Sequence, residues 1–366
     1  MDLNAFMERG TSNIVETATR YYTRSVRGTR YLAHKAIATK RAAKTRARLE
    51  REGVHVPAFL IASIASECNL ECEGCYAHAH NAIGPAAKEA ELSDEAWRRV
   101  FAEASDIGVA FILLAGGEPT LRRRVIEEAA AFKDIMFAIF TNSTTFDDDL
   151  LALLDENRNL VSVFSTEGTD EQTDARRGAG VAERVRKAQE SCTERGILWG
   201  ASITVTTENL DAVTEPEFVR ELHERGCGIY ICNEFVPVAK GSGRLALTMP
   251  EHDRLLERMS VINADPALDA MSAIAFPGDE ESMGGCLAAG RGFFHISQSG
   301  AAEPCPFSPF SVANVADVGL LGALKSPFFE RIREIEARHA DEHMGGCTLF
   351  LHQQEVQQAV ALESGD

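Results

Sequence analysis

Short apolar runs alternate with longer segments of helical periodicity from residue 56 onward. A short apolar run indicates a buried strand, and apolar residues that recur every three to four positions indicate a helix with one buried face. The predicted strands are 59–65, 110–114, 135–140, 160–164, 198–205 and 228–232. The predicted helices lie near 93–106, 121–132, 147–155, 179–195, 211–225 and 250–262. Six alternating units predict an α/β fold of parallel strands joined by crossover helices, either partly closed into a barrel or left as an open sheet.

Polar residues and glycines follow most of these strands at the point where each strand ends. The segments are Cys68, Gly116–Pro119, Thr141–Asn142, Ser165–Gly168 and Asn233–Glu234. The carboxyl ends of parallel strands meet at one edge of a sheet, which is where α/β proteins build their sites. We therefore expect these segments, which are distant in sequence, to converge at the carboxyl edge of the sheet, which we call the mouth.

The alternation stops after residue 270, where prolines and glycines such as Pro277–Gly278 and Gly284–Gly285 mark a loop-rich region. Phe293–Ser297 and Ala301–Pro304 flank a Ser-Gly pair and predict a β-hairpin. A further helix is predicted near 326–338. The predicted organisation is a helical N-terminal arm at 1–55, an α/β body at 56–270 and a small C-terminal module at 271–366.

Composition places the 366-residue chain among ordinary globular proteins, with 45% hydrophobic and 25% charged residues. No apolar run approaches the roughly 18 residues that a membrane span needs, and the N-terminus lacks the pattern of a signal peptide. We therefore expect a cytoplasmic protein. Nine cysteines in such a protein indicate metal binding or catalysis rather than disulfides.

The net charge of −18 is distributed unevenly. Residues 1–55 carry 12 Lys/Arg and 5 Asp/Glu, a net of +7, and the rest of the chain has a net of −25. The acidic body argues against nucleic acid as a substrate. The basic arm from Arg20 to Arg51 has two interpretations: a solvated helix pair packed on the acidic body, or contact with an anionic membrane surface or partner.

Three cysteines, Cys68, Cys72 and Cys75, follow the first predicted strand in a C-x3-C-x2-C spacing. Three thiolates at this spacing can hold three corners of a cubane iron–sulfur cluster and leave the fourth iron without a protein ligand. The alternative is a zinc site that His78 and His80 would complete.

The cysteine motif, with Tyr76 directly after its third cysteine, resembles the signature of the radical S-adenosylmethionine (SAM) enzymes over roughly residues 56–235. The resemblance implies a partial (βα)6 barrel and a 4Fe–4S cluster whose open iron chelates SAM. It also implies reductive cleavage of SAM to a 5′-deoxyadenosyl radical that abstracts a hydrogen atom from the substrate. A reductant such as flavodoxin or ferredoxin is implied as a partner.

The second strand end resembles the GGEP loop of that family, formed here by Gly116, Gly117, Glu118 and Pro119. The family's loop binds the amino group of SAM, because glycines permit close approach and a carboxylate accepts hydrogen bonds from an ammonium. A simple turn is the alternative. Asn142, at the third strand end, either forms a hydrogen bond in the mouth or caps a turn.

Four other residues match family positions. Tyr76 corresponds to the aromatic residue near the adenine of SAM, and Ser165 and Glu167 resemble the strand end near its ribose. Arg177, followed by Gly178, resembles an arginine–glycine pair that helps to hold SAM; an exposed helix arginine is the alternative. No catalytic acid, base or radical residue is assigned.

The C-terminal region holds Cys286, Cys305 and Cys347 in Gly-Cys and Pro-Cys contexts around the predicted hairpin. This arrangement resembles the SPASM or shorter twitch module of radical SAM enzymes, which carries an auxiliary iron–sulfur cluster. With three cysteines one cluster at most is expected, and its fourth ligand is another residue, water or the substrate. The alternative is three unconnected structural cysteines.

The remaining candidates are weaker. Cys192, Cys227 and Cys232 lie in helix- or strand-like segments and are expected to be small core residues. His295 is expected to be structural rather than directed inward. No role is assigned to His343 or His352.

Two functions remain open at this point. The first is a radical SAM enzyme that modifies a peptide or a small molecule. The second is a non-catalytic iron–sulfur electron carrier or cofactor-assembly protein, which needs the clusters but not the SAM motifs. Glu234 is placed in the mouth by its position alone and has no assigned role.

Overall fold

The computed structural model describes residues 13, 15–23, 25–84, 87, 89–268, 271–276, 285–339 and 347–364. Pro277–Gly278, Gly284 and His343 lie outside these residues. Within them, no helix has an apolar stretch long enough to cross a bilayer.

One nine-stranded sheet forms the centre of the molecule, in the order β7-β6-β5-β4-β3-β2-β1-β8-β9. Its strands are β1 Phe59–Ala65, β2 Phe111–Gly116, β3 Met136–Thr141, β4 Leu160–Thr166, β5 Trp199–Val205, β6 Cys227–Glu234, β7 Ser272–Phe276, β8 His295–Ile296 and β9 Ala302–Glu303. All neighbouring pairs are parallel except the β8–β9 hairpin. The six predicted strands and the predicted hairpin are thereby confirmed.

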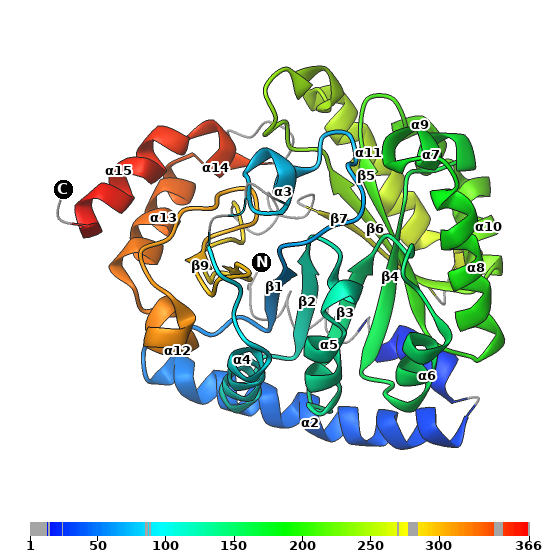
Figure 1. The fold of residues 1–366 in the computed structure, drawn as a ribbon, viewed down its shortest axis with the longest axis horizontal. Coiled ribbons are helices and arrows are strands. Elements are labelled where there is room, and N and C mark those ends of the chain that lie inside the picture. Colours follow the sequence, from blue (N-terminus) through cyan, green and yellow to red (C-terminus); the bar gives the residue numbers. More distant parts are fainter. Residues whose placement is uncertain are drawn as a thin grey trace.

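The helices follow the predicted alternation with the strands. Their bounds are α2 Val26–Arg51, α3 Tyr76–Ala79, α4 Asp94–Ile107, α5 Arg123–Ala130, α6 Asp148–Glu156, α7 Asp170–Arg177, α8 Val181–Glu194, α9 Leu210–Val213, α10 Pro216–Glu224, α11 Met249–Ala264, α12 Val315–Leu324, α13 Pro327–Arg338, α14 Thr348–Leu351 and α15 Gln353–Ser364. Figure 1 shows α4, α5, α6, α8 and α10 outside the curved sheet. The helix α4 illustrates the local signals, because the Ser93 side chain accepts from the Ala96 amide and Gly108 ends the helix at φ 88°.

The two faces of the sheet differ in burial. Ile112 and Leu114 of β2 are buried against the helices, whereas the alternating residues Leu113 and Ala115 are only half-buried. The same alternation continues in β3. Successive side chains of a strand point to opposite faces. The inner face of the sheet is therefore partly open, and the carboxyl ends of the strands surround it.

The N-terminal arm lies beneath the amino ends of the strands, where Figure 1 shows α2 along the lower edge. Lys35 is fully buried, and its ammonium donates to the backbone oxygens of Ala110 (2.9 Å) and Asp134 (2.8 Å). Arg27 pairs with Asp155 of the acidic body at 2.7 Å. The interpretation of the arm as helices packed on the acidic body is confirmed. Contact with a membrane stays a prediction.

The C-terminal residues extend the sheet at both edges. β7 adds a parallel strand beside β6, which the sequence pattern did not reveal. β8 lies parallel to β1, with Ile61 opposite His295, and places the C-terminal helices beside the loop that follows β1. The predicted helix near 326–338 is confirmed as α13. The division of the chain at residue 270 stays a prediction.

Candidate active site

The three cysteines of the motif lie in the loop between β1 and α3, at the carboxyl edge of the sheet. Cys68, Cys72 and Cys75 are all half-buried free thiols. The Cys75 amide donates to the Cys72 carbonyl (3.3 Å), and the Glu73 amide donates to the carbonyl of Arg176 (3.1 Å). The loop is thus held both by itself and by the end of α7. It presents three thiols in one short segment at the predicted mouth.

Burial makes the thiols of Cys68 and Cys72 poor free nucleophiles but suitable ligands. Desolvation raises the pKa of Cys68 to about 11, and it raises the pKa of Cys72 although Arg177 and Arg176 oppose the shift. A thiolate in such surroundings needs a positive partner, and binding of iron releases the thiol protons. The donor set therefore fits a metal cofactor.

The zinc alternative finds no support in the geometry. The ligands of one ion lie close together, whereas thiolates on a cluster bind different irons. Among the residues that the structure describes, no three of the motif cysteines, His78 and His80 bring ligand atoms within 4.8 Å of one another. His78 instead lies with its Nε2 3.2 Å from the Leu70 carbonyl oxygen.

The GGEP loop packs directly on the start of the cysteine loop. The amide of Gly117 donates to the Ala65 carbonyl at 2.7 Å, and that of Glu118 donates to the Glu67 carbonyl at 2.8 Å. A Cβ at Gly117 would lie 2.0 Å from the Glu67 carbonyl oxygen. Glycine is therefore required here, and the two loops are positioned as one unit.

The carboxylate of Glu118 joins the ends of two strands. It is 1% exposed, and its Oε1 accepts from the Thr120 amide (3.1 Å) and from the hydroxyls of Thr120 (2.6 Å) and Thr141 (2.8 Å). Its Oε2 accepts from the Asn142 amide (2.8 Å). Burial raises the pKa of this carboxyl group, and the four hydrogen bonds oppose the shift. Its predicted contact with the SAM amino group stays a prediction, as does any contact of Pro119, which begins a short 3-10 helix.

Asn142 makes both kinds of contact considered from the sequence, a turn hydrogen bond and a hydrogen bond in the mouth. Its Oδ1 accepts from the Thr144 amide at 2.9 Å, which makes it a turn residue. Its Nδ2 donates to the Oδ1 of Asn69 at 3.0 Å, and Asn69 belongs to the cysteine motif. The residue therefore connects the end of β3 to the loop that carries the thiols.

The short helix α7 places two arginines beside Glu167 at the end of β4. Thr169 caps the start of α7 in a capping box, and the hydroxyl of Thr173 accepts from the Glu167 amide at 3.1 Å. The last turn of α7 then places Arg176 and Arg177 beside the carboxylate. The local sequence thus explains why residues ten positions apart meet.

Glu167 is 2% exposed. Its Oε1 accepts hydrogen bonds from both guanidinium groups, at 2.5 Å from Arg176 and 2.7 Å from the Nε of Arg177. Burial alone would lower the pKa of Arg177, but Glu167 and the nearby thiols Cys72 and Cys75 raise it overall. The three side chains carry a net positive charge directly beside the cysteine loop. This charge suits an anionic cofactor, and Arg177 is not an exposed helix arginine.

Polar side chains line the inner face beyond this group. Ser165 is half-buried and lies opposite Ser202 of β5, whose hydroxyl accepts from the Nδ2 of Asn233 at 2.8 Å. Glu234 was expected in the mouth but faces the other way. Its Oε2 lies 2.6 Å from the Nδ1 of His252 of α11, and both residues are buried.

A buried chain of polar groups, which sequence reasoning missed, joins the cysteine loop to the C-terminal hairpin. The hydroxyl of Tyr76 shares a hydrogen bond with Ser63. Ser63 lies 2.7 Å from the Nε2 of His295, and the Nδ1 of His295 lies 2.6 Å from Glu303. The expected structural role of His295 is thereby supported. Burial raises the pKa of Tyr76 well above its usual range.

The C-terminal cysteines are all buried in the main core. The Ala289 amide donates to the Pro304 carbonyl (3.1 Å), which brings the Cys286 turn beside the segment of Cys305. Cys347 precedes α14. Cluster binding by these three residues stays a prediction. Buried positions for Cys192, Cys227 and Cys232, the three expected core cysteines, are confirmed.

Comparison with known proteins identifies the family. The family model of the radical SAM superfamily matches residues 63–215, a segment that spans the cysteine motif, the GGEP loop and the Glu167–Arg177 pair. The chain is a radical SAM enzyme. Radical SAM enzymes bind a 4Fe–4S cluster and SAM, and the thiol loop and the positive charge beside it fit that pair.

Two curated relatives show different extents of likeness to this radical SAM enzyme. Fe-coproporphyrin III synthase of Methanosarcina barkeri is 30% identical over 151 residues, which are 40% of this chain and 37% of the relative. PqqA peptide cyclase of Gluconobacter oxydans is 25% identical over 314 residues, which are 80% of this chain and 85% of the relative.

A solved structure of SuiB from Streptococcus suis, bound to the precursor peptide SuiA, shares the fold. Its TM-score is 0.64 at 19% identity, and the likeness covers 80% of this chain and 71% of SuiB. The α/β architecture with a partial radical SAM barrel is therefore confirmed.

Proposed function

We propose that this radical SAM enzyme modifies a peptide substrate. The observation that carries the proposal is the alignment with a peptide cyclase along 80% of the chain, which is far more than the cysteine motif. The mycofactocin maturase MftC of Mycolicibacterium smegmatis aligns with a similar extent, 81% of this chain at 23% identity. The partly open inner face, with Asn233, gives a substrate a polar group to bind.

Different residues of the mouth hold the cluster and SAM. Cys68, Cys72 and Cys75 would hold the cluster, which when bound would supply the electron for cleavage of SAM. The glycines of the GGEP loop bring backbone groups close to the cluster site, and Arg177 with Glu167 orients charge beside it. Gly116, Gly117, Glu118, Pro119, Asn142, Tyr76, Ser165, Glu167 and Arg177 form the proposed SAM site.

An auxiliary iron–sulfur cluster bound by Cys286, Cys305 and Cys347 belongs to the same proposal. Its fourth ligand is another residue, water or the substrate. Iron analysis and electron paramagnetic resonance of the reconstituted protein, with and without substrate, test this assignment. We expect a second set of cluster signals that disappears in Cys305→Ala and persists in Cys192→Ala. A single 4Fe–4S cluster per chain would contradict it.

The activity is tested with anaerobically reconstituted protein, SAM and dithionite. We expect 5′-deoxyadenosine above the level of Cys72→Ala, and a mass change in a short precursor peptide encoded beside the gene. Product equal to the Cys72→Ala control would instead support a non-catalytic electron carrier or assembly protein. Product without any peptide change would contradict only the substrate class.

A tetrapyrrole is the second candidate substrate. Fe-coproporphyrin III synthase and AdoMet-dependent heme synthase, both of Methanosarcina barkeri, are also relatives, and the latter aligns over 72% of this chain at 23% identity. Iron coproporphyrin III is therefore the comparison substrate in the same assay. A mass change in the porphyrin and none in the peptide would favour this second function.

The partners of the reaction follow from the same proposal. A low-potential donor such as flavodoxin or ferredoxin supplies the electron, and the cytoplasm is the proposed location. Surface contact of the basic arm with a membrane is a further part of this proposal, although Arg27 and other arm residues already pair with the acidic body.

A further inference from the structure

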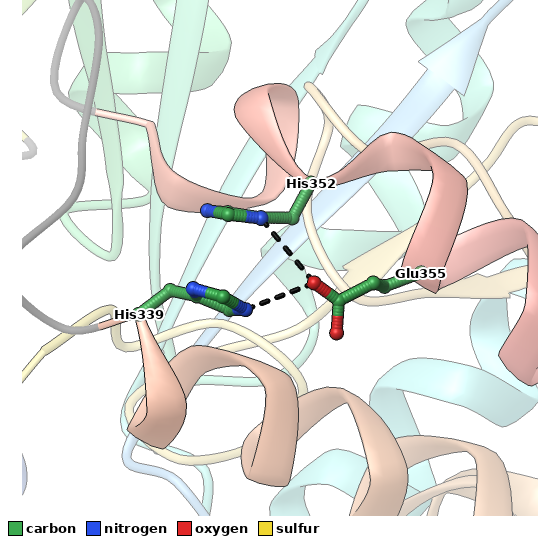
Figure 2. A group of neighbouring side chains, drawn as sticks. All are labelled: His339, His352 and Glu355. Atoms are coloured by element: carbon green, nitrogen blue, oxygen red, sulfur yellow. Dashed lines mark hydrogen bonds and ion pairs between the residues drawn. The ribbon is translucent and has the colours of Figure 1, made fainter.

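Two histidines and a glutamate converge in the C-terminal module, at residues distinct from the cysteines of the proposed cluster sites. His339 follows the end of α13, His352 ends α14, and Glu355 lies in the first turn of α15. Figure 2 shows the two imidazole rings lying parallel, with one nitrogen of each directed at the same carboxylate oxygen. The three ligand atoms all lie within 4.8 Å of one another. No other group of this kind occurs among the described residues.

The distances suit ligands of one ion. The Nε2 of His339 lies 2.9 Å from the Oε1 of Glu355, and the Nδ1 of His352 lies 3.4 Å from the same oxygen. Zinc binds nitrogen and oxygen ligands at about 2.0–2.2 Å in tetrahedral geometry, which separates neighbouring ligand atoms by roughly 3.3 Å. The two nitrogen–oxygen separations therefore fit ligands of one zinc ion.

The surroundings of Glu355 leave one of its carboxylate oxygens to bind an ion. Arg338 lies with its Nη2 2.9 Å from the Oε2 of Glu355, so this oxygen is already engaged and Oε1 is directed at the rings. Such a partner beyond the ligands fixes a carboxylate in one orientation.

The rings of His339 and His352 are stacked, with their centroids 3.6 Å apart and their planes inclined by 17°. The lone pair of an imidazole nitrogen lies in the plane of its ring, so the two rings would rotate out of this stack to bind one ion.

We propose that His339, His352 and Glu355 bind a zinc ion that has a structural role. The ion would connect the end of α13 to α14 and α15, whose packing forms the outer part of the C-terminal module (Figure 1). α14 is only four residues long, and Cys347 directly precedes it. Zinc at the far end of this helix holds the segment that carries Cys347, the third proposed ligand of the auxiliary cluster. The donor set of two nitrogens and one oxygen distinguishes this site from the thiolate sites.

Zinc content of the full-length, cluster-loaded protein tests the proposal. Protein is purified without oxygen, incubated with one equivalent of zinc sulfate, desalted and analysed for zinc and iron by mass spectrometry. We expect about one zinc per chain in the wild type and a loss of at least ten-fold in His352→Ala and Glu355→Gln. His55→Ala is the matched control, because His55 pairs with Glu50 at 2.7 Å but has no second histidine beside it.

Zinc X-ray absorption and circular dichroism complete the test. Nitrogen and oxygen ligands without sulfur are expected, whereas sulfur ligation would show zinc in a cysteine site and overturn the proposal. A wild type without retained zinc, or variants that retain as much as the wild type, would also overturn it. Circular dichroism identifies a variant that fails to fold, and the conservative Glu355→Gln then decides the outcome by itself.

Discussion

Glu167 shows how a single buried carboxylate organises one side of the mouth. Arg176 and Arg177 share its Oε1, while its Oε2 accepts from the Thr204 amide at 3.1 Å. The residue thus joins β4, α7 and β5 at their ends. Two guanidinium groups compensate one carboxylate, so the arrangement tolerates an anionic partner but not the loss of Glu167.

Replacement of Glu167 by alanine should therefore destabilise the protein. Loss of one partner from a buried ion pair costs about 3–5 kcal/mol, because the remaining charges stay uncompensated. Urea unfolding of the anaerobic protein measures this cost. Glu183→Ala is the control, since its pair with Lys187 is mostly exposed and its loss should leave the stability close to that of the wild type. A cost below about 1 kcal/mol for Glu167→Ala would contradict the buried-pair interpretation.

Gly117 is the second position where one residue determines the site. A methyl group there would meet the Glu67 carbonyl oxygen, a backbone atom that cannot rotate away. Gly117→Ala should separate the GGEP loop from the cysteine loop and lower 5′-deoxyadenosine formation by about 100-fold, since misplacement by roughly 1 Å has effects of that size. Gly243→Ala, with no atom within 4 Å of the added methyl group, should retain wild-type activity. Equal activity of the two variants would contradict the prediction.

At the scale of elements, α2 depends on a buried lysine for its attachment to the sheet. Lys35 donates to the carbonyls that precede β2 and β3 and lies 4.8 Å from the centre of the Phe111 ring. Desolvation lowers the pKa of its ammonium to about 7, although Asp134 opposes the shift. The unfolded chain, with an ordinary lysine pKa, binds a proton more readily than the folded protein does.

The free energy of unfolding should therefore include a part that rises with pH. Between about pH 7 and the ordinary lysine pKa of about 10.4, the unfolded state holds more protons, so this lysine adds at most about 1.4 kcal/mol per pH unit. Below the lowered pKa the folded state also binds the proton and the dependence ends. Urea unfolding of the wild type and of Lys35→Met across this range measures the difference. The same pH slope in both proteins would refute the assignment.

For the whole molecule, the arm closes one end of the sheet and the cofactor loops occupy the other. Tyr22 and Tyr31 pack against Ala110, Phe111 and Met136 beneath the strands. Removal of residues 1–55 would uncover this apolar surface, and exposed apolar patches of that kind promote association.

The shortened protein should therefore aggregate or bind a hydrophobic dye, as light scattering and dye fluorescence would show. Arg48→Ala keeps the arm and changes only its exposed pair with Glu52, so it should behave as the wild type does. A monomeric shortened protein with the wild-type melting temperature would show that the arm is dispensable.

The orientation of Glu234 and the strand β7 were not predicted from the sequence, and each has a physical reason. The predicted sixth strand ended at residue 232, whereas β6 continues to Glu234. Side chains alternate along a strand, so Asn233 faces inward and Glu234 faces His252. β7 escaped notice because its five residues lie among loop-forming residues, and a short strand has few apolar positions to mark it.

The sequence by itself determined the alternating strands and helices, the cysteine motif and the loops that share its edge of the sheet. Those features are local, because they depend on periodicity and on residues that are close in the chain. The tertiary structure alone decided which partners the polar groups meet: four hydrogen bonds for Glu118, two arginines for Glu167, and one shared oxygen for His339 and His352. Contacts between residues distant in the chain depend on how whole elements pack, and no local pattern records that packing.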